Sequence, residues 1–284
     1  MTTFRKAVQG EGFAISAELT IGKESTADDI RRQADSLAGL VDGIQVTDNP
    51  YAWVQMSALA ASSILVEHGF DPVPIMTCRD RNRLALQSDL VGLQAVGVEN
   101  VMLMRGHRVP KDHSVPASTV FDLTGQELIA LAASLDGDFF IGTGARLFRP
   151  GPRWQAESLV RRAKAGAQFL QTQICFNMDV LQRYIKQFLA VGLERDYSVM
   201  VSLSPLPSAT TARWVRKHLS DSRIPAEVIR RLEGAADPEQ EGIRICAEMM
   251  QQIAEIPGFS GVNLMTTGDP AALRETIRAS GLKD

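Results

Sequence analysis

Cysteines are few in this sequence, and long hydrophobic runs are absent. The three cysteines, Cys78, Cys175 and Cys246, are an odd number without CxxC spacing, which argues against a disulfide framework or a structural zinc site. We expect them to be packing residues. No apolar run reaches about 18 residues, and the first residues, MTTFRKAVQGEG, are polar, so neither a membrane span nor a signal peptide is indicated. The sequence therefore predicts a cytoplasmic protein with no membrane partner.

Charge of one sign is not in excess either. The 284 residues include 30 basic and 33 acidic ones, a net charge of -3, so nucleic acid is not an expected partner. His68, His113 and His218 lack metal-ligand spacing, and we expect them on the surface, with no bound metal. The chain ends soon after its last strand-helix unit, so we expect no appended regulatory domain. The sequence leaves a homo-oligomer open.

Short apolar runs bounded by turn residues recur along the whole chain. We predict buried strands at 13–17, 43–46, 73–76, 100–104, 138–141, 169–172, 198–202 and 260–264. Segments with helical periodicity lie between them, such as 26–40, 52–68, 81–96, 125–135 and 242–256. Apolar, non-alternating strands fit a parallel sheet covered on both faces, so eight such units predict one (β/α)8 TIM barrel spanning residues 1–284. A doubly wound open sheet is the alternative, but no GxGxxG follows the first strand.

The segment 163–176, AKAGAQFLQTQICF, is the most informative stretch. We predict a helix over 154–164, a small-residue corner at 165–167, and a buried strand over 168–172. This strand delivers the amide of Gln173 to its C-terminal end. Gln173 is therefore either a placed functional group or an amide that satisfies backbone groups at the rim.

In a TIM barrel the reactive residues cluster where the strands end. The strand ends predicted here carry Glu18, Thr47, Asp48, Thr77, Cys78, Arg105, His107, Thr143, Gln173, Ser204 and Thr266. Glu18 is the clear proton donor of this set, because desolvation beside apolar side chains raises a carboxyl pKa toward the range useful to a general acid. The alternative is a salt bridge between Glu18 and Arg105 at the rim.

Several short motifs stand at these positions in a fixed order. They are AEL with Glu18, Val46-Thr47, Thr77-Cys78, Arg105-Gly106, the block from Ala165 to Gln173, Arg223-Ile224-Pro225 and the closing GVNLMTTGD. In this order they resemble the methylenetetrahydrofolate reductases, flavin-dependent barrels that interconvert 5,10-methylene- and 5-methyltetrahydrofolate. The stretch VFDLTGQELI looks most like the branch found in the one-carbon metabolism of acetogens and related microbes.

The resemblance implies a role for each matching residue. Glu18 would protonate the bridging nitrogen of methylenetetrahydrofolate, and Gln173 would hydrogen-bond the pterin and the nicotinamide in turn. Contacts to FAD would come from Thr47, Arg105, Gly106, His107, Arg162 and Ala165, with Arg162 on the pyrophosphate. The co-substrate would be NADH or NADPH, and folate contacts would also involve His107, Thr211 and Trp214. From the residues alone, Arg162 fits a solvated face equally well, and Thr47 or Asp48 fits a helix cap.

Departures from the family pattern touch the cofactor contacts. His107 stands where the family commonly has Asp, and GARLFRPGP replaces a loop that contacts the flavin in many members. Ile75-Met76 stands where the family usually has a histidine, just before Thr77-Cys78. The aromatic residue that the family has on the helix after the seventh strand falls near Trp214 and Val215. We hypothesise that His107 favours the anionic reduced flavin and hence the methyl-oxidising direction. FMN in place of FAD, direct hydride transfer without flavin, and a non-catalytic folate-binding barrel stay open as alternatives; no strand-end lysine supports an aldolase.

Overall fold

The computed structural model describes residues 3–110, 116–219, 221–266 and 271–283. Eight parallel strands close into a barrel in the order β1 to β8. They are β1 (Ala14–Glu18), β2 (Gly43–Val46), β3 (Pro72–Thr77), β4 (Asn100–Met104), β5 (Phe140–Ala145), β6 (Phe169–Thr172), β7 (Ser198–Leu203) and β8 (Gly261–Leu264). The predicted TIM barrel is confirmed, and the doubly wound alternative is wrong.

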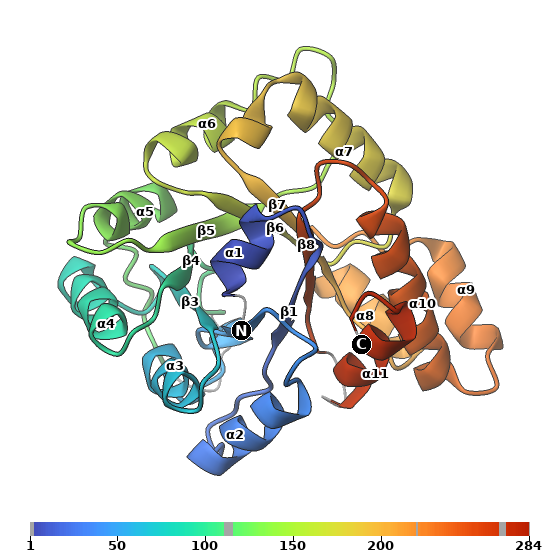
Figure 1. Cartoon of the computed structure of the whole chain (residues 1–284), viewed down its shortest axis with the longest axis horizontal. Coiled ribbons are helices and arrows are strands. Elements are labelled where there is room, and N and C mark those ends of the chain that lie inside the picture. Colours follow the sequence, from blue (N-terminus) through green and yellow to red (C-terminus); the bar gives the residue numbers. More distant parts are fainter. Residues whose placement is uncertain (1–2, 111–115, 220, 267–270, 284) are drawn as a thin grey trace.

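Helices surround the barrel between successive strands (Figure 1). They are α1 (Phe4–Gln9), α2 (Ala27–Ser36), α3 (Ala58–Glu67), α4 (Arg83–Ala95), α5 (Gly125–Ala133), α6 (Glu157–Lys164), α7 (Met178–Ala190), α8 (Ala209–His218), α9 (Ala226–Gly234), α10 (Pro238–Ala254) and α11 (Ala271–Ser280), with short 3-10 turns η1 (Pro50–Ala52) and η2 (Leu193–Arg195). The strands are buried along almost their entire length, which explains their apolar, non-alternating sequences.

Helix α1 was not predicted, and it closes one end of the barrel. Phe4 is fully buried and its ring lies 5.5 Å from that of Phe169 and 6.1 Å from that of Phe140. Gly43 makes room for it, since a Cβ there would lie 2.6 Å from the Phe4 ring. Figure 1 shows α1 across the barrel centre, on the face that carries both termini. The C-terminal ends of the strands, where the candidate site residues are expected, therefore lie at the opposite end.

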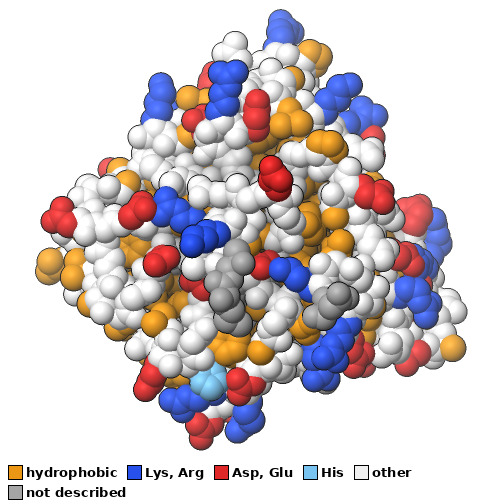
Figure 2. Space-filling view, in the orientation of Figure 1, with side chains coloured by type: hydrophobic (Ala, Val, Ile, Leu, Met, Phe, Trp, Pro, Cys, Tyr) orange, Lys and Arg blue, Asp and Glu red, His pale blue; other side chains and the backbone are white. Residues whose placement is uncertain are grey.

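The face that carries the termini has no field of one sign. Figure 2 shows Lys and Arg side chains interspersed there with Asp and Glu. No helix among the described residues is long and apolar enough to cross a membrane. The three cysteines are buried and free, which confirms that they pack in the interior.

Strand β5 lies later in the chain than the predicted strand 138–141. Thr143, which we expected after this strand, lies inside it. The error arises because Gly142 and Gly144 look like turn residues, whereas Gly142 is required within the barrel: a Cβ there would lie 2.1 Å from the Phe169 ring. The glycine thus marks close packing and not the end of the strand.

Helix α6 and the corner after it fix the position of Arg162. The helix begins at Glu157 and not at Trp154, because Ala156 has a left-handed backbone (φ 52°), which a right-handed helix cannot include. It ends at Lys164, and Gly166 follows two residues later with a φ of 117° and a close approach to Ala133, both of which favour glycine. The predicted small-residue corner is therefore confirmed.

Candidate functional site

Glu18 is the last residue of β1 and lies partly buried at the C-terminal end of the barrel. Burial raises the pKa of its carboxyl group from 4.5 to about 7. None of the described residues forms an ion pair with it, so the alternative of a salt bridge to Arg105 is wrong. A carboxyl group without a nearby cation keeps its proton near neutral pH and can give it to a bound molecule.

A layer of buried polar side chains lies in the barrel below Glu18. Gln45, paired in register with Glu18, exchanges two amide hydrogen bonds with Gln171 across the barrel; the bond donated by Gln171 measures 3.1 Å. Ser16 donates to Asn263 Oδ1 at 2.8 Å. These residues were missed, although a polar residue inside an apolar strand run is a visible signal. They surround the base of the site with neutral dipoles, so they leave the raised pKa of Glu18 in place.

The loop after β2 is held by reciprocal hydrogen bonds. Thr47 Oγ1 donates to Gln55 Oε1 at 2.9 Å, and Gln55 Nε2 donates to the Thr47 carbonyl at 2.5 Å. Asp48 accepts bonds of 2.8 Å from the backbone and the hydroxyl of Thr77. Neither Thr47 nor Asp48 caps a helix, so that alternative is wrong; both stabilise the rim.

The loop after β4 carries Arg105, Gly106 and His107. The Arg105 guanidinium lies 4.1 Å from the centre of the Phe121 ring. Gly106 has φ 79°, and a Cβ there would lie 2.9 Å from Thr77 Cβ, so the loop crosses the end of β3 only with glycine. His107 is exposed. Gly106 therefore lets this loop cross the end of β3, while Arg105 packs on Phe121.

Gln173 follows β6 directly, as predicted. Its Oε1 accepts a hydrogen bond of 3.3 Å from the Ile174 backbone, whereas its amide nitrogen bonds to none of the described residues. The side chain is partly exposed, so this nitrogen is available as a donor to a ligand.

Helix α8 contributes aromatic surface. Trp214 is 46% exposed and Val215 is buried, so Trp214 is the aromatic residue that faces outward. Its ring lies 5.8 Å from that of Tyr51, edge to face, and 4.6 Å from the ring of His218. Thr211 is engaged with Ser208 at the start of the helix. Tyr51 was missed because it lies in a loop without a motif.

Arg162 is not on a solvated face. Its Nη1 donates to the Gly144 carbonyl at 2.6 Å and to Thr143 Oγ1 at 3.2 Å. Burial lowers the pKa of this guanidinium. Helix α6 is thereby tied to the C-terminal half of β5, and Ala165 ends the same helix.

A pocket of about 530 Å³ opens beside Arg162. It is lined by four arginines, Arg146, Arg153, Arg161 and Arg162, and by the aromatic residues Phe148, Trp154 and Tyr184. Arg146 pairs with Asp221 at 2.8 Å, but Arg153 and Arg161 form no ion pair with the described residues. Unpaired guanidinium groups next to aromatic rings fit an anion that is joined to a flat ring, such as the diphosphate and base of a dinucleotide.

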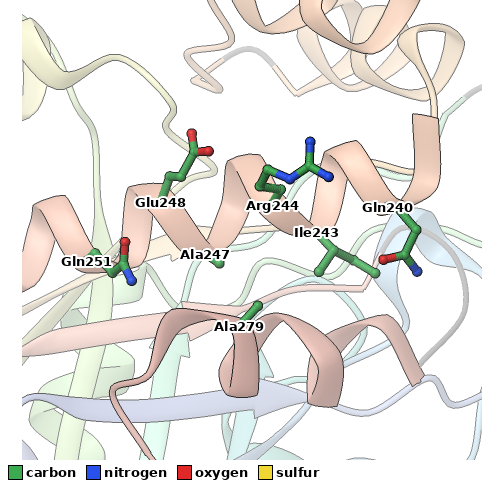
Figure 3. A pocket seen from close by; sticks show the side chains of 7 residues that line it. All are labelled: Gln240, Ile243, Arg244, Ala247, Glu248, Gln251 and Ala279. Atoms are coloured by element: carbon green, nitrogen blue, oxygen red, sulfur yellow. The ribbon is translucent and has the colours of Figure 1, made fainter. Parts of the chain in front are cut away.

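A smaller pocket, about 190 Å³, lies between α10 and α11 on the outside of the barrel (Figure 3). Its floor is Ile243, Ala247 and Ala279, and its polar residues are largely engaged: Glu248 pairs with Arg231, and Gln251 donates to the Ser280 carbonyl at 3.0 Å. No strand-end residue lines it, so it is separate from the site around Glu18.

Two of the three histidines that lack metal-ligand spacing lie on the outer surface. His68 is exposed and accepts or donates at 2.8 Å to Asp35 Oδ1, and His218 is exposed as well, as predicted. His113 lies outside the described residues. Within the described part of the chain, no cluster of three His, Cys, Asp or Glu side chains is arranged to hold a metal ion.

Comparisons with known proteins support one family. Residues 3–281 match the family model of methylenetetrahydrofolate reductase. The "Probable methylenetetrahydrofolate reductase (NADPH)" of Caenorhabditis elegans is 24% identical over 242 residues, which are 81% of this chain and 35% of that protein. This chain thus spans about a third of that relative.

Solved structures share the fold. An uncharacterised protein from Clostridium thermocellum, described as binding two copies of 5-methyl-5,6,7,8-tetrahydrofolic acid, superposes with a TM-score of 0.67 at 13% identity and covers 97% of this chain and 96% of its own. Ligand-free tryptophan synthase from M. tuberculosis follows with a TM-score of 0.51, 14% identity and coverage of 98% and 94%. At these identities the likeness shows the barrel alone.

Proposed function

Because the chain belongs to the methylenetetrahydrofolate reductase family, we propose that it is an oxidoreductase that interconverts 5,10-methylenetetrahydrofolate and 5-methyltetrahydrofolate. The observation that carries this proposal is Glu18, a carboxyl group with a pKa raised to about 7 and no cationic partner among the described residues, at the C-terminal end of the barrel. Such a group can give a proton to a nitrogen leaving group and take it back in the reverse reaction.

In the reducing direction Glu18 donates its proton to the bridging nitrogen of methylenetetrahydrofolate. The bond between the methylene carbon and that nitrogen breaks, and its electron pair stays on the protonated nitrogen. The methylene group is then a 5-iminium cation, which accepts a hydride and becomes the methyl group. In the oxidising direction hydride leaves the methyl group, and the Glu18 carboxylate takes the proton from the nitrogen that closes the ring.

Gln173 orients the folate in this proposal. Its free amide nitrogen is a donor at the end of β6, and the pterin ring carries carbonyl and ring-nitrogen acceptors. Because its Oε1 is held by the Ile174 backbone at 3.3 Å, the amide has a fixed orientation. A fixed donor lowers the entropic cost of aligning the ring beside Glu18.

The pocket beside Arg162 fits a dinucleotide cofactor. Arg161, Arg153 and Arg162 offer guanidinium donors for a diphosphate, and Trp154 and Phe148 offer aromatic surface for a base. A bound FAD would supply hydride transfer between NADH or NADPH and the folate. Thr47, Arg105, Gly106 and His107 are further residues proposed to contact it, since they follow strands β2 and β4 at the mouth of the barrel. Ala165, which the family resemblance adds, follows helix α6 at the opposite end of the barrel.

A flavin-independent reaction is the second candidate. The same donors fit the diphosphate of NADH or NADPH, because a diphosphate is common to both kinds of dinucleotide. In that reaction the nicotinamide would pass its hydride directly to the folate, and Glu18 and Gln173 would keep their roles.

The first test is the visible spectrum of the purified protein, titrated with FAD or FMN and then, without oxygen, with 5-methyltetrahydrofolate. Flavin bands that bleach on addition of the folate support the flavin-dependent reaction. If no flavin binds, an assay with NADH and methylenetetrahydrofolate tests direct transfer. A protein that shows neither reaction, with turnover in wild type no higher than in Glu18→Gln, contradicts the proposed function and leaves a non-catalytic folate-binding barrel.

A further inference from the structure

The loop between β2 and α3 holds an uncommon backbone. Asn49, Tyr51 and Ala52 have φ values of 46°, 55° and 65°. Residues with a Cβ rarely adopt this left-handed region, and a bulky aromatic residue does so least readily. Three such residues within four positions require neighbours that hold them there.

Two hydrogen bonds hold Asn49 in this conformation. Gln55 N donates to Asn49 Oδ1 at 3.1 Å, and the buried Arg79 donates from Nη2 to the Asn49 carbonyl at 2.9 Å. The reciprocal bonds between Thr47 and Gln55 close the loop at its other end. The loop is therefore clamped in one conformation, with Tyr51 at its centre.

The conformation brings the Tyr51 ring against Trp214 of helix α8. The ring meets Trp214 edge to face, with centroids 5.8 Å apart and planes at 72°. Burial, and to a smaller degree the negative charge of Glu18, raise the pKa of the Tyr51 hydroxyl, so the tyrosine lies within electrostatic reach of the carboxyl group. Tyr51 and Trp214 are still 51% and 46% exposed.

We propose that Tyr51 is a substrate-binding residue and that, together with Trp214, it forms an aromatic wall against which the pterin ring of the folate packs beside Glu18. This inference rests on the proposed function. The wall fits the pterin better than the nicotinamide, because the pterin nitrogen has to reach Glu18 and Tyr51 lies within electrostatic reach of that carboxyl group. Packing of a flat ring on tyrosine and tryptophan accounts for the exposed aromatic surface and for the clamped loop.

A variant at position 51 has to tolerate the left-handed backbone of Tyr51. Tyr51→Gly removes the ring and also suits a φ of 55°, so the loop keeps its conformation and the protein keeps its Tm. Tyr51→Phe keeps the ring and removes the hydroxyl. Leu84→Ala is the matched control, since Leu84 is an exposed large side chain (77%) on α4.

Binding of 5-methyltetrahydrofolate is measured without oxygen by calorimetry, and the KM values for folate and for NADH or NADPH are measured separately. We expect Tyr51→Gly to weaken folate binding about tenfold or more, with the nicotinamide KM and the Tm close to wild type. Tyr51→Phe and Leu84→Ala stay within about twofold of wild type.

Two results would overturn the inference while leaving the proposed function intact: folate binding by Tyr51→Gly that equals wild type, or a loss of Tm and of affinity for both substrates, which marks a purely structural tyrosine. If the wild-type protein binds no folate at all, the proposed function fails, and the inference fails with it.

Discussion

Arg162 of helix α6 donates a hydrogen bond of 2.6 Å to the main-chain carbonyl of Gly144 in strand β5. The bond connects the helix that ends at the small-residue corner with the strand whose C-terminal end faces the mouth. The Arg162 side chain also lines the arginine-rich pocket. One side chain therefore fixes a strand end and contributes positive charge to a proposed cofactor site.

Replacing Arg162 by Met tests whether its structural role differs from that of the neighbouring Arg161. We expect Arg162→Met to lower stability by about 1–3 kcal/mol, because the Gly144 carbonyl loses a charged donor, and to weaken binding of FAD or of ADP. Arg161→Met is the control: Arg161 lines the same pocket but is exposed and forms no ion pair with described residues, so it should weaken ADP binding without a comparable loss of Tm. Chemical denaturation and ADP titration distinguish the two. Equal losses of stability in both variants would show that the strand anchor is not specific to Arg162.

The raised pKa of Glu18 predicts opposite pH profiles in the two directions. Reduction of methylenetetrahydrofolate needs the protonated carboxyl group, so its rate should fall as the pH rises through about 7. Oxidation of 5-methyltetrahydrofolate needs the carboxylate, so its rate should rise over the same range. Measured from pH 5.5 to 9 in both directions, profiles that change in the same sense would exclude Glu18 as the acid and base.

Burial of the Glu18 carboxyl group should also destabilise the folded protein above about pH 4.5. Its pKa in the folded protein, about 7, exceeds the ordinary value of 4.5, so the unfolded chain binds fewer protons than the folded one between these values. Stability should therefore decline as the pH rises from about 4.5 to about 7 and then level off, by up to about 3 kcal/mol. Glu18→Gln should remove this decline and be more stable than wild type at pH 8, as measured by urea denaturation at both ends of the range. A variant that is less stable at pH 8 would contradict the assigned burial.

His107 provides a test of reaction direction, provided that flavin binds. A potential cation next to reduced flavin favours its anionic form, and a carboxylate opposes it. We expect His107→Asp to lower the midpoint potential of the flavin and to slow methyl oxidation relative to methylene reduction. Potentiometry in the presence of a reference dye measures the change; an unchanged or higher potential would refute the hypothesis.

The sequence was sufficient for the barrel because parallel strands are covered on both faces and therefore appear as apolar runs. The strands at 43–46 and 100–104 were predicted with their observed limits. Strand β5 was misplaced because Gly142 serves packing against Phe169, and a glycine in a sequence does not show which surface it approaches. Helix α1 was missed because six residues give too short a periodic pattern.

The site was predictable where a side chain directly follows a strand, as for Glu18 and Gln173. It was not predictable where a role depends on contacts between distant segments. Tyr51 meets Trp214 because of backbone angles that its sequence does not reveal, and Arg162 turns inward although it belongs to a cluster of cations. Gln45 and Gln171 meet across the barrel over 126 positions, a pairing that only the closed fold creates.

The buried amide pair of Gln45 and Gln171 gives the last prediction. Each side chain satisfies the other, so Gln45→Met should leave the Gln171 amide without its partner and cost about 1–3 kcal/mol, and Gln171→Met should do the same. The double variant replaces both amides with apolar chains of similar length, so it should be more stable than the sum of the single losses implies. Thermal and urea denaturation of the four proteins measures this coupling. Strictly additive losses would show that the two amides do not depend on one another.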